Sequence, residues 1–210
     1  MSEAEFVTDW QQRYLNGDTP WDKGYASPPL DELIHRLGVS VLGEGEVWVP
    51  GCGSGHDVRR LAEHGIKAVG LDIAPAAIEL AKSHPRLHNE RYELMNFLDP
   101  SQRIGRQASA IWEHTCFCAI DPSSRDDYAR SAGELLAPGS TLAGVFFLNP
   151  RDDGDDMSGP PFPSTQEAID VCFGPWFERV AAWQPESAYP GREGREWLAV
   201  YKRLTQGSVL

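Results

Sequence analysis

The chain has 210 residues, with 31 acidic against 19 basic side chains and a formal net charge of −12. This acidic balance, without a long Lys/Arg run, argues against nucleic-acid binding and favours a small molecule as the partner. Hydrophobic residues make up 41% of the chain, which excludes a wholly disordered protein and predicts a single domain over residues 1–210.

The sequence predicts neither a membrane span nor export nor a metal site. Its longest apolar stretches, such as Leu142–Leu148, are far shorter than the roughly 20 residues that a membrane helix requires. The acidic start, Met1–Asp9, does not resemble a signal peptide, so we expect a cytoplasmic protein, and we expect it to be a monomer. The cysteines are then free thiols, and no two histidines have the spacing of metal ligands beside a carboxylate.

Two helical segments, Glu3–Asn16 and Pro28–Leu37, precede the first predicted strand, and residues 1–40 are expected to form a helical cover. From residue 46 onward, short apolar runs alternate with helical patterns, which is typical of a parallel α/β sheet. The predicted strands are Glu46–Pro50, Lys67–Asp72, Arg91–Leu94, Ala108–Glu113 and Thr141–Leu148. The predicted helices are Asp57–His64, Pro75–Ser83, a segment with Tyr128, Ala132, Leu135 and Leu136 on one stripe that ends at Pro138-Gly139, and Ser164–Phe173.

The last part of the chain departs from this alternation. Asn149–Pro163 is rich in Pro, Gly and Asp and is predicted to be a long loop; because such loops are usually functional, we expect it to be a substrate lid. Two final strands, Phe177–Gln184 and Glu196–Arg203, are separated by too few residues for a helical crossover, which predicts an antiparallel hairpin. The sheet core is therefore expected over residues 46–203.

Three alternating glycines follow the first strand, in Pro50-Gly51-Cys52-Gly53-Ser54-Gly55. Glycines are needed where the backbone turns sharply and a ligand approaches main-chain amides. A dinucleotide-binding turn, G-x-G-x-x-G, requires its third glycine at the position of His56, so an NAD-dependent oxidoreductase is disfavoured. Alternating glycines suit a ligand without a pyrophosphate, such as S-adenosylmethionine.

Asp72 closes the second strand, where its carboxylate can accept hydrogen bonds from both hydroxyls of a ribose. Plainer interpretations stay open. The glycines suffice for a tight strand-to-helix turn, and Asp72 suits the cap of the next helix. Trp10 and Trp21, taken singly, are more typical of a core than of a ligand site.

Six segments of the chain carry a resemblance to a known family. They are Asp9-Trp10-Gln11-Gln12-Arg13-Tyr14, Gly17-Asp18-Thr19-Pro20-Trp21-Asp22, Pro50-Gly51-Cys52-Gly53-Ser54-Gly55, Glu113-His114-Thr115-Cys116-Phe117-Cys118-Ala119-Ile120-Asp121-Pro122, Gly159-Pro160-Pro161-Phe162-Pro163 and Arg192-Glu193-Gly194-Arg195-Glu196-Trp197-Leu198. In this order they resemble the thiopurine methyltransferase superfamily and, within it, the halide and thiol methyltransferases of plants and bacteria.

The resemblance implies a class I, Rossmann-like α/β methyltransferase fold that binds S-adenosylmethionine. Its sheet would have seven strands, mostly parallel with the last antiparallel, with helices on both faces and an N-terminal helical cover. Carried over by position, the cofactor-binding residues are an aromatic cover of Trp10, Tyr14 and Trp21, the turn glycines Gly51, Gly53 and Gly55, Asp72 at the ribose, Asn96 and Phe97 at the adenine, and His114 at the cofactor's carboxylate end or the substrate mouth.

Three positions depart from the commoner pattern of the family. Tyr14 stands where tryptophan is frequent, Asn96 where aspartate is frequent, and His114 where arginine or tyrosine is frequent. The Asn96 carbonyl can still accept from the adenine amino group, but a histidine is a weaker, pH-dependent cation. Because of Asn96 and His114, an alternative remains open in which the protein binds the cofactor as a non-catalytic regulatory module.

The implied reaction is methyl transfer to a small soft nucleophile: a thiol, hydrosulfide, a halide, or a selenium or thiopurine compound, with detoxification as the expected role. Such nucleophiles offer a lone pair at neutral pH, so displacement at a sulfonium requires no catalytic base, and the sequence shows no evident acid–base dyad. Cys116 and Cys118 are expected as buried small hydrophobes without a role.

The predicted lid carries four carboxylates against one guanidinium in Arg151-Asp152-Asp153-Gly154-Asp155-Asp156. An acidic mouth repels anions, which predicts a preference for thiols and hydrosulfide over free halide, although a solvated loop tip is the alternative. Arg192 and Arg195 near the last hairpin are candidates to hold an anionic group on the substrate side.

Overall fold

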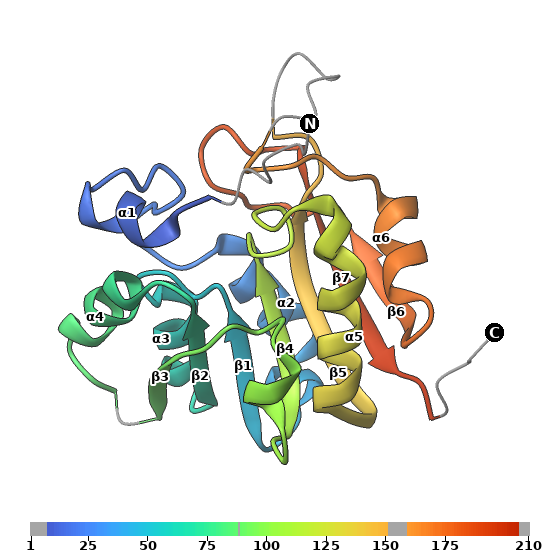
Figure 1. Cartoon of the computed structure of the whole chain (residues 1–210). Coiled ribbons are helices and arrows are strands. Elements are labelled where there is room, and N and C mark those ends of the chain that lie inside the picture. The colour runs from blue at the N-terminus through green and yellow to red at the C-terminus, as the bar shows by residue number, and fades with distance from the viewer. Residues whose placement is uncertain (1–7, 88, 151–158, 206–210) are drawn as a thin grey trace, which may run out of the picture.

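The computed structural model describes residues 8–87, 89–150 and 159–205. Seven strands form one sheet in the order β3-β2-β1-β4-β5-β7-β6 (Figure 1). The strands are β1 (Glu46–Pro50), β2 (Lys67–Asp72), β3 (Glu90–Leu94), β4 (Ala108–His114), β5 (Leu136–Phe147), β6 (Phe177–Trp183) and β7 (Glu196–Arg203). β7 runs antiparallel to both neighbours while the other pairs are parallel, which confirms the predicted fold class and terminal hairpin.

Helices cover both faces of the sheet because the buried strands are apolar on both sides. Within β1, Val47 and Val49 pack with α2 (Pro28–Leu37) and α3 (His56–Glu63), while Trp48 packs on the opposite face. That face is covered by α5 (Arg125–Leu135) and α6 (Gln166–Phe173). Figure 1 shows α5 and α6 on the near side of the sheet and α2 and α3 behind it.

The remaining short elements position the loops around the sheet. α4 (Pro75–Ser83) packs beside β2 and β3 and contacts α1 (Trp10–Leu15), which lies above the carboxyl ends of the first strands. Three 3-10 turns are η1 (Val39–Leu42), η2 (Pro100–Arg103) and η3 (Pro122–Ser124). None of the helices in the described ranges is long and apolar enough to cross a bilayer.

Most predicted boundaries lie within two residues of the observed ones, but those at the start of the first helix and between α5 and β5 were wrong by more. The first helix begins at Trp10, where the Asp9 carboxylate caps it by accepting from the Gln12 amide, whereas the prediction began at Glu3; residues 1–7 lie outside the described residues. α5 ends at Leu135, and Leu136 opens β5 opposite Ala108. Leu136 is buried in the strand, as it would be in a helix, so its apolar character did not distinguish the two. Pro138-Gly139 does not end a helix but falls in the register shift of β5, where a residue without an N–H is tolerated because the regular ladder is interrupted.

Candidate active site

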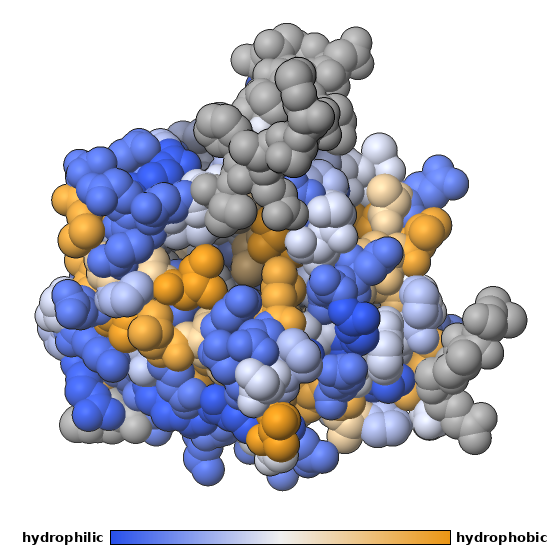
Figure 2. Space-filling model, in the orientation of Figure 1, coloured by the Kyte–Doolittle hydropathy of each residue, from blue (hydrophilic) through white to orange (hydrophobic). Residues whose placement is uncertain are grey.

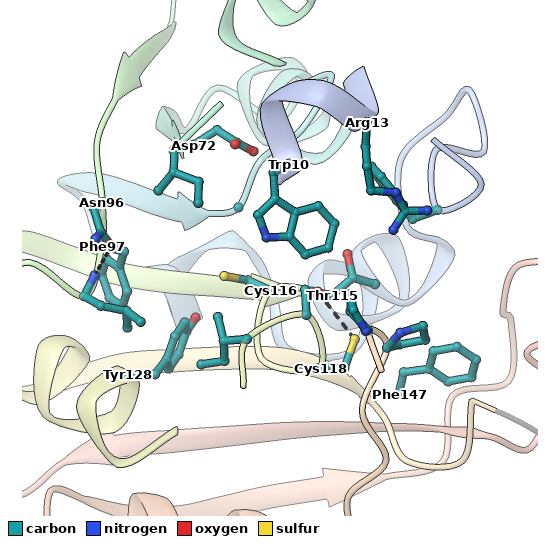
Figure 3. Close-up of a pocket in the computed structure, with 18 of the residues that line it drawn as sticks. Trp10, Arg13, Asp72, Asn96, Phe97, Thr115, Cys116, Cys118, Tyr128 and Phe147 are labelled. Carbon is teal, nitrogen blue, oxygen red and sulfur yellow. Dashed lines mark hydrogen bonds between the residues drawn. The ribbon is translucent and has the colours of Figure 1, made fainter. Parts of the chain in front are cut away.

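The carboxyl ends of β1, β2, β4 and β5 border a cavity of about 190 Å³ that α1 covers (Figure 3). In an open parallel sheet a ligand binds at this edge, where the strand order reverses, here between β1 and β4. The cavity is lined by Trp10, Arg13, Tyr14, Trp21, Gly51, Asp72, Ile73, residues 95–98, Thr115, Cys116, residues 118–120, Tyr128, Phe147, Pro160, Pro161 and Arg192. Figure 2 shows hydrophobic residues gathered in the middle of this face of the molecule, beside α1.

The glycine turn brings main chain close to neighbouring side chains. Gly51 and Gly53 have φ of +60° and +53°, which side chains other than glycine rarely adopt. A Cβ on Gly51 would lie 3.0 Å from the Cys116 Sγ, and one on Gly53 would lie 2.7 Å from the Tyr14 hydroxyl. Gly51 lines the large cavity and Gly53 lines a smaller recess beside it, while Gly55 begins α3 against Tyr92 and lines neither.

Asp72 joins the glycine turn to the end of β2. It is 8% exposed, and its two carboxylate oxygens accept from the Gly53 amide at 3.0 Å and the Ala74 amide at 2.9 Å. Burial raises the pKa of this carboxyl, against the effect of the amides that donate to it. Asp72 also lines the cavity, and a carboxylate can accept more than two hydrogen bonds, so the capping and ribose-binding interpretations of Asp72 are compatible.

The predicted adenine side lies just after β3. Phe97 is 4% exposed and its ring packs 5.0 Å from that of Tyr128. Asn96 is exposed, and its side-chain oxygen accepts from the Leu98 amide at 3.0 Å. The oxygen that would receive the adenine amino group therefore already has one partner, which fixes its direction.

The three cover aromatics contact one another above the cavity. The Trp21 ring nitrogen donates to the Tyr14 hydroxyl at 3.1 Å, and the Trp10 and Trp21 rings meet edge to face at 5.3 Å. Sequence reasoning missed Arg13, whose guanidinium lies 4.4 Å over the Trp21 ring and pairs with Asp18 at 2.9 Å. The spacing of three residues from Trp10 on one helix face could have revealed it.

His114 ends β4 and lines the smaller recess, of about 50 Å³, rather than the large cavity. Its Nδ1 lies 2.9 Å from the carboxylate of Asp57, which also accepts from the Ser27 amide and the Trp112 indole, each at 2.7 Å. Burial raises the pKa of Asp57, but His114 and these donors outweigh it and hold the pKa below its usual value. The Nε2 of His114 is buried without a partner among the described residues, so it is free to meet a ligand.

The two candidate arginines lie at different distances from the cavity. Arg192 is 8% exposed, lines it, stacks 4.6 Å over the Phe147 ring and pairs with Glu196 at 3.2 Å. Arg195 is half-buried in the hairpin and is not among the lining residues; its backbone carbonyl accepts from the Leu148 amide. The structure therefore brings only Arg192 to the cavity.

The β4–α5 segment contributes wall residues that the sequence interpretation left without a role. Cys116 and Cys118 both line the cavity, and burial raises the pKa of Cys118 to about 12 and that of Cys116 well above its usual value. Both are therefore protonated thiols at neutral pH, as expected for small apolar groups. No cluster of three metal-binding side chains occurs among the described residues.

The residues present fit S-adenosylmethionine. The glycine turn offers close main-chain approach where a Cβ would collide, Asp72 offers acceptors, and the unpartnered Nε2 of His114 faces the recess beside the turn. This sheet order, the glycine turn after β1 and the acid ending β2 define a class I S-adenosylmethionine-dependent methyltransferase.

Comparison with known proteins agrees with this class. The sequence profile of the thiopurine S-methyltransferase family matches residues 6–201. The chain is 33% identical over 202 residues to thiocyanate methyltransferase 1 of Brassica oleracea, covering 93% of this chain and 84% of that protein. It is 32% identical over 203 residues to a probable thiol methyltransferase 2 of Arabidopsis thaliana, covering 92% and 84%.

A solved structure shares the fold at lower identity. It is the 1,6-didemethyltoxoflavin-N1-methyltransferase of Burkholderia thailandensis with bound 1,6-didemethyltoxoflavin and S-adenosylhomocysteine, with a TM-score of 0.68, 17% identity and coverage of 98% of this chain and 94% of that one. The chain belongs to the thiopurine S-methyltransferase family and is a methyltransferase. Neither the oxidoreductase nor the non-catalytic alternative is favoured by any of these findings.

Proposed function

We propose that this methyltransferase uses S-adenosylmethionine to methylate small thiols and hydrosulfide, in preference to free halide. The preference rests on the observation that the positively charged side chains lining the cavity are already ion-paired. The two arginines that line it, Arg13 and Arg192, each face a carboxylate, Asp18 and Glu196. A cavity whose cations are already paired attracts a free anion weakly and accepts a neutral, polarisable thiol, or hydrosulfide in its protonated, neutral form.

The cofactor would lie between the glycine turn and the loop after β3. Gly51 and Gly53 would take its methionine part, with His114 at the carboxylate, while Asp72 would take the ribose and Asn96 and Phe97 the adenine. The cover aromatics Trp10, Tyr14 and Trp21 would close over it. When bound, S-adenosylmethionine supplies a methyl group already activated by a sulfonium charge.

The protein's contribution to the reaction is alignment and exclusion of water. Walls of Phe147, Cys116 and Pro161 present polarisable and apolar surface to the acceptor. Holding the acceptor in line with the methyl group replaces an encounter in solution, which is worth several kcal/mol of the barrier in well-oriented reactions, roughly 7–11 in the best cases. The N–H groups of Arg192 that do not face Glu196 would orient a polar group on the acceptor.

Relatives carry names that include thiocyanate, thiol and thiopurine substrates, which supports thiopurines as further acceptors. We also include selenium compounds in the proposed acceptor class, because selenium is a soft nucleophile like sulfur. The predicted acidic mouth, residues 151–156, lies outside the described residues, while Pro160 and Pro161 of the proposed lid line the cavity. We place the enzyme in the cytoplasm, as a monomer with a role in detoxification.

The test compares kcat/KM for a small thiol, hydrosulfide and iodide at matched ionic strength. We expect the sulfur acceptors to exceed iodide by roughly tenfold or more, about 1.4 kcal/mol of discrimination. Equal values for iodide and the thiol would contradict the preference. If the acidic mouth contributes, the value for iodide rises with added inert salt, because screening weakens its repulsion.

A further inference from the structure

Glu113 and Tyr128 form a buried pair that the mechanism above leaves unused. Glu113 precedes His114 at the end of β4 and is 1% exposed, and Tyr128 on α5 is fully buried. The Tyr128 hydroxyl donates to one carboxylate oxygen of Glu113, and the Phe117 amide donates to the other at 2.7 Å. Burying a carboxyl is costly unless it is hydrogen-bonded, and here both of its oxygens accept hydrogen bonds.

Tyr128 borders the cavity, and its hydroxyl bonds to this carboxyl. Tyr128 is one of the cavity's lining residues, whereas Glu113 is not. In Figure 3 the Tyr128 ring stands at the floor of the pocket with its oxygen directed toward the middle of the lining side chains, on the side of Cys116. A proton that leaves the cavity through Tyr128 therefore arrives at Glu113.

A neutral thiol brings such a proton. Its sulfur must lose the proton when it gains a methyl group, and at neutral pH an aliphatic thiol, with a pKa of about 8.5 or higher, is mostly protonated. Neither Cys116 nor Cys118 can take the proton, because both are themselves protonated thiols. Among the other polar lining residues, Asp72 already accepts from two backbone amides and Asn96 from one, whereas Tyr128 is bonded directly to a second buried carboxyl.

We propose that Tyr128 and Glu113 form a proton relay that accepts the proton of a thiol acceptor during methyl transfer. The inference rests on the proposed function. The thiol sulfur uses a lone pair to form the new S–C bond, and the methyl–sulfonium bond breaks with its electron pair left on the cofactor's sulfur. The thiol proton passes to the Tyr128 oxygen while the phenolic proton passes to Glu113, so Tyr128 ends neutral and Glu113 ends protonated.

The ionisation of the pair suits this task. Burial raises the pKa of Glu113 to about 7, although the Phe117 amide, the Tyr128 hydroxyl and His114 act to lower it. Burial also holds the pKa of Tyr128 well above its usual value, so the phenol exchanges one proton for another rather than losing one. The titratable groups that face Glu113 are Tyr128 from α5, His114 beside it on β4, and Cys116 and Cys118 from the following loop. β5 presents only Gly144 to it in the strand register.

The chain contains a matched control for the loss of a tyrosine hydroxyl. Tyr201 on β7 is 1% exposed and donates to the Asp170 carboxylate at 2.8 Å, but it does not line the cavity. Tyr201→Phe removes the same kind of hydrogen bond away from the site. A general loss of packing affects both tyrosine variants, and a lost relay affects only Tyr128→Phe.

The experiment measures kcat/KM for an aliphatic thiol and for iodide, which carries no proton, near neutral pH. In Glu113→Gln and Tyr128→Phe the thiol-to-iodide ratio is expected to fall by roughly tenfold or more, and in Tyr201→Phe it is expected to stay at the wild-type value. Calorimetric titration with S-adenosylhomocysteine establishes that each variant is folded. An unchanged ratio in both site variants overturns the relay, and transfer to no acceptor by the wild-type enzyme overturns the proposed function together with it.

Two measurements on the wild-type protein do not depend on the variants folding. With the relay, kcat/KM for the thiol rises with pH through about 7, as Glu113 ionises, and then levels. A rate that instead follows the thiolate fraction up to the thiol's own pKa, about 8.5 or higher, overturns the relay. Infrared spectra of the ligand-free protein should show the band of a protonated carboxyl that disappears as the pH rises through about 7. If no such band is present at pH values above the pKa of ordinary carboxyls, the proposed role of Glu113 is contradicted.

Discussion

At the scale of single residues, Asp72 supports the glycine turn and faces the cavity with the same carboxylate. Its amide partners, Gly53 and Ala74, belong to the loops that follow β1 and β2, so the side chain links the two segments that would surround the cofactor. The position of Asp72 at the cavity was predictable because a strand-ending acid after a glycine turn is a local pattern. Its bonds to these two amides depend on the fold.

Asp72→Asn removes the charge and one acceptor oxygen while it keeps the size of the side chain. We expect the Kd for S-adenosylhomocysteine to rise by about tenfold or more, since a hydrogen bond to a charged acceptor is worth roughly 1.5–3 kcal/mol. Calorimetric titration measures it. Asp170→Asn, outside the cavity, is the control, and a Kd that matches the wild type in both variants would remove Asp72 from the binding site.

Glu113 makes folding stability depend on pH in a predictable direction. Its pKa is raised from 4.5 to about 7 in the folded state, so the folded chain binds this proton more tightly than the unfolded chain. The contribution of Glu113 to the free energy of unfolding is therefore fully present below about pH 4.5 and is lost as the pH rises through about 7. Glu113→Gln has no carboxyl to ionise and should therefore not lose this stability as the pH rises.

Thermal melts of ligand-free protein test this dependence. The Tm of Glu113→Gln relative to wild type should increase between acidic and mildly alkaline pH by several degrees, since about 1 kcal/mol moves the Tm of a chain of this size by roughly 2–4 °C. A Tm difference that is constant with pH would show that Glu113 titrates normally.

At the scale of elements, the start of α3 ties the N-terminal cover to the sheet. Asp57 in its first turn accepts from the backbone of Ser27, which immediately precedes α2, and from Trp112 and His114 on β4. These partners are distant in sequence, so no periodicity could predict them. The positions of α3 and β4 were nevertheless predictable, because each is set by its own apolar pattern.

Asp57→Ala leaves three buried donors without an acceptor. We expect the free energy of unfolding to fall by about 3–5 kcal/mol, the usual cost of breaking a buried charged network. Asp31→Ala, whose side chain is 47% exposed in its pair with Arg60, should cost less than about 1 kcal/mol. Urea denaturation compares the two, and similar values for both would show that the Asp57 network is of little consequence for stability.

The aromatic cover is expected to act on the ligand more than on the fold. Trp21→Ala should raise the dissociation rate of S-adenosylhomocysteine by roughly tenfold and lower turnover, because the ring closes the cavity and holds Tyr14. Trp183→Ala removes an indole that bonds Glu32 outside the cavity and should leave that rate unchanged. Stopped-flow displacement measures both; a collapse of the ligand-free Tm in Trp21→Ala would identify Trp21 as part of the core.

At the scale of the whole molecule, the parallel part of the sheet was predictable from the alternation of apolar runs, and the antiparallel hairpin from the short connection before residue 196. The strand order was not predicted from these patterns, because it depends on how the strands pair in the folded chain. Residues that line the cavity were predictable only where they belong to a continuous sequence motif, as Gly51 and Arg192 do. Tyr128 and Glu113 were missed because they meet only in the folded chain, whereas Arg13 was missed although its spacing from Trp10 on α1 is a local signal. The boundary between α5 and β5 was missed because Leu136 is buried in either conformation.

Methyl transfer from S-adenosylmethionine to sulfur can be followed by mass spectrometry of the products formed from S-adenosylmethionine with a deuterated methyl group, a small thiol and the purified protein. We expect a deuterated methyl thioether and an equimolar amount of S-adenosylhomocysteine, with rates that saturate in both substrates. Saturable binding of S-adenosylhomocysteine without any methylated thiol, hydrosulfide or halide would contradict this expectation and favour a non-catalytic binding protein.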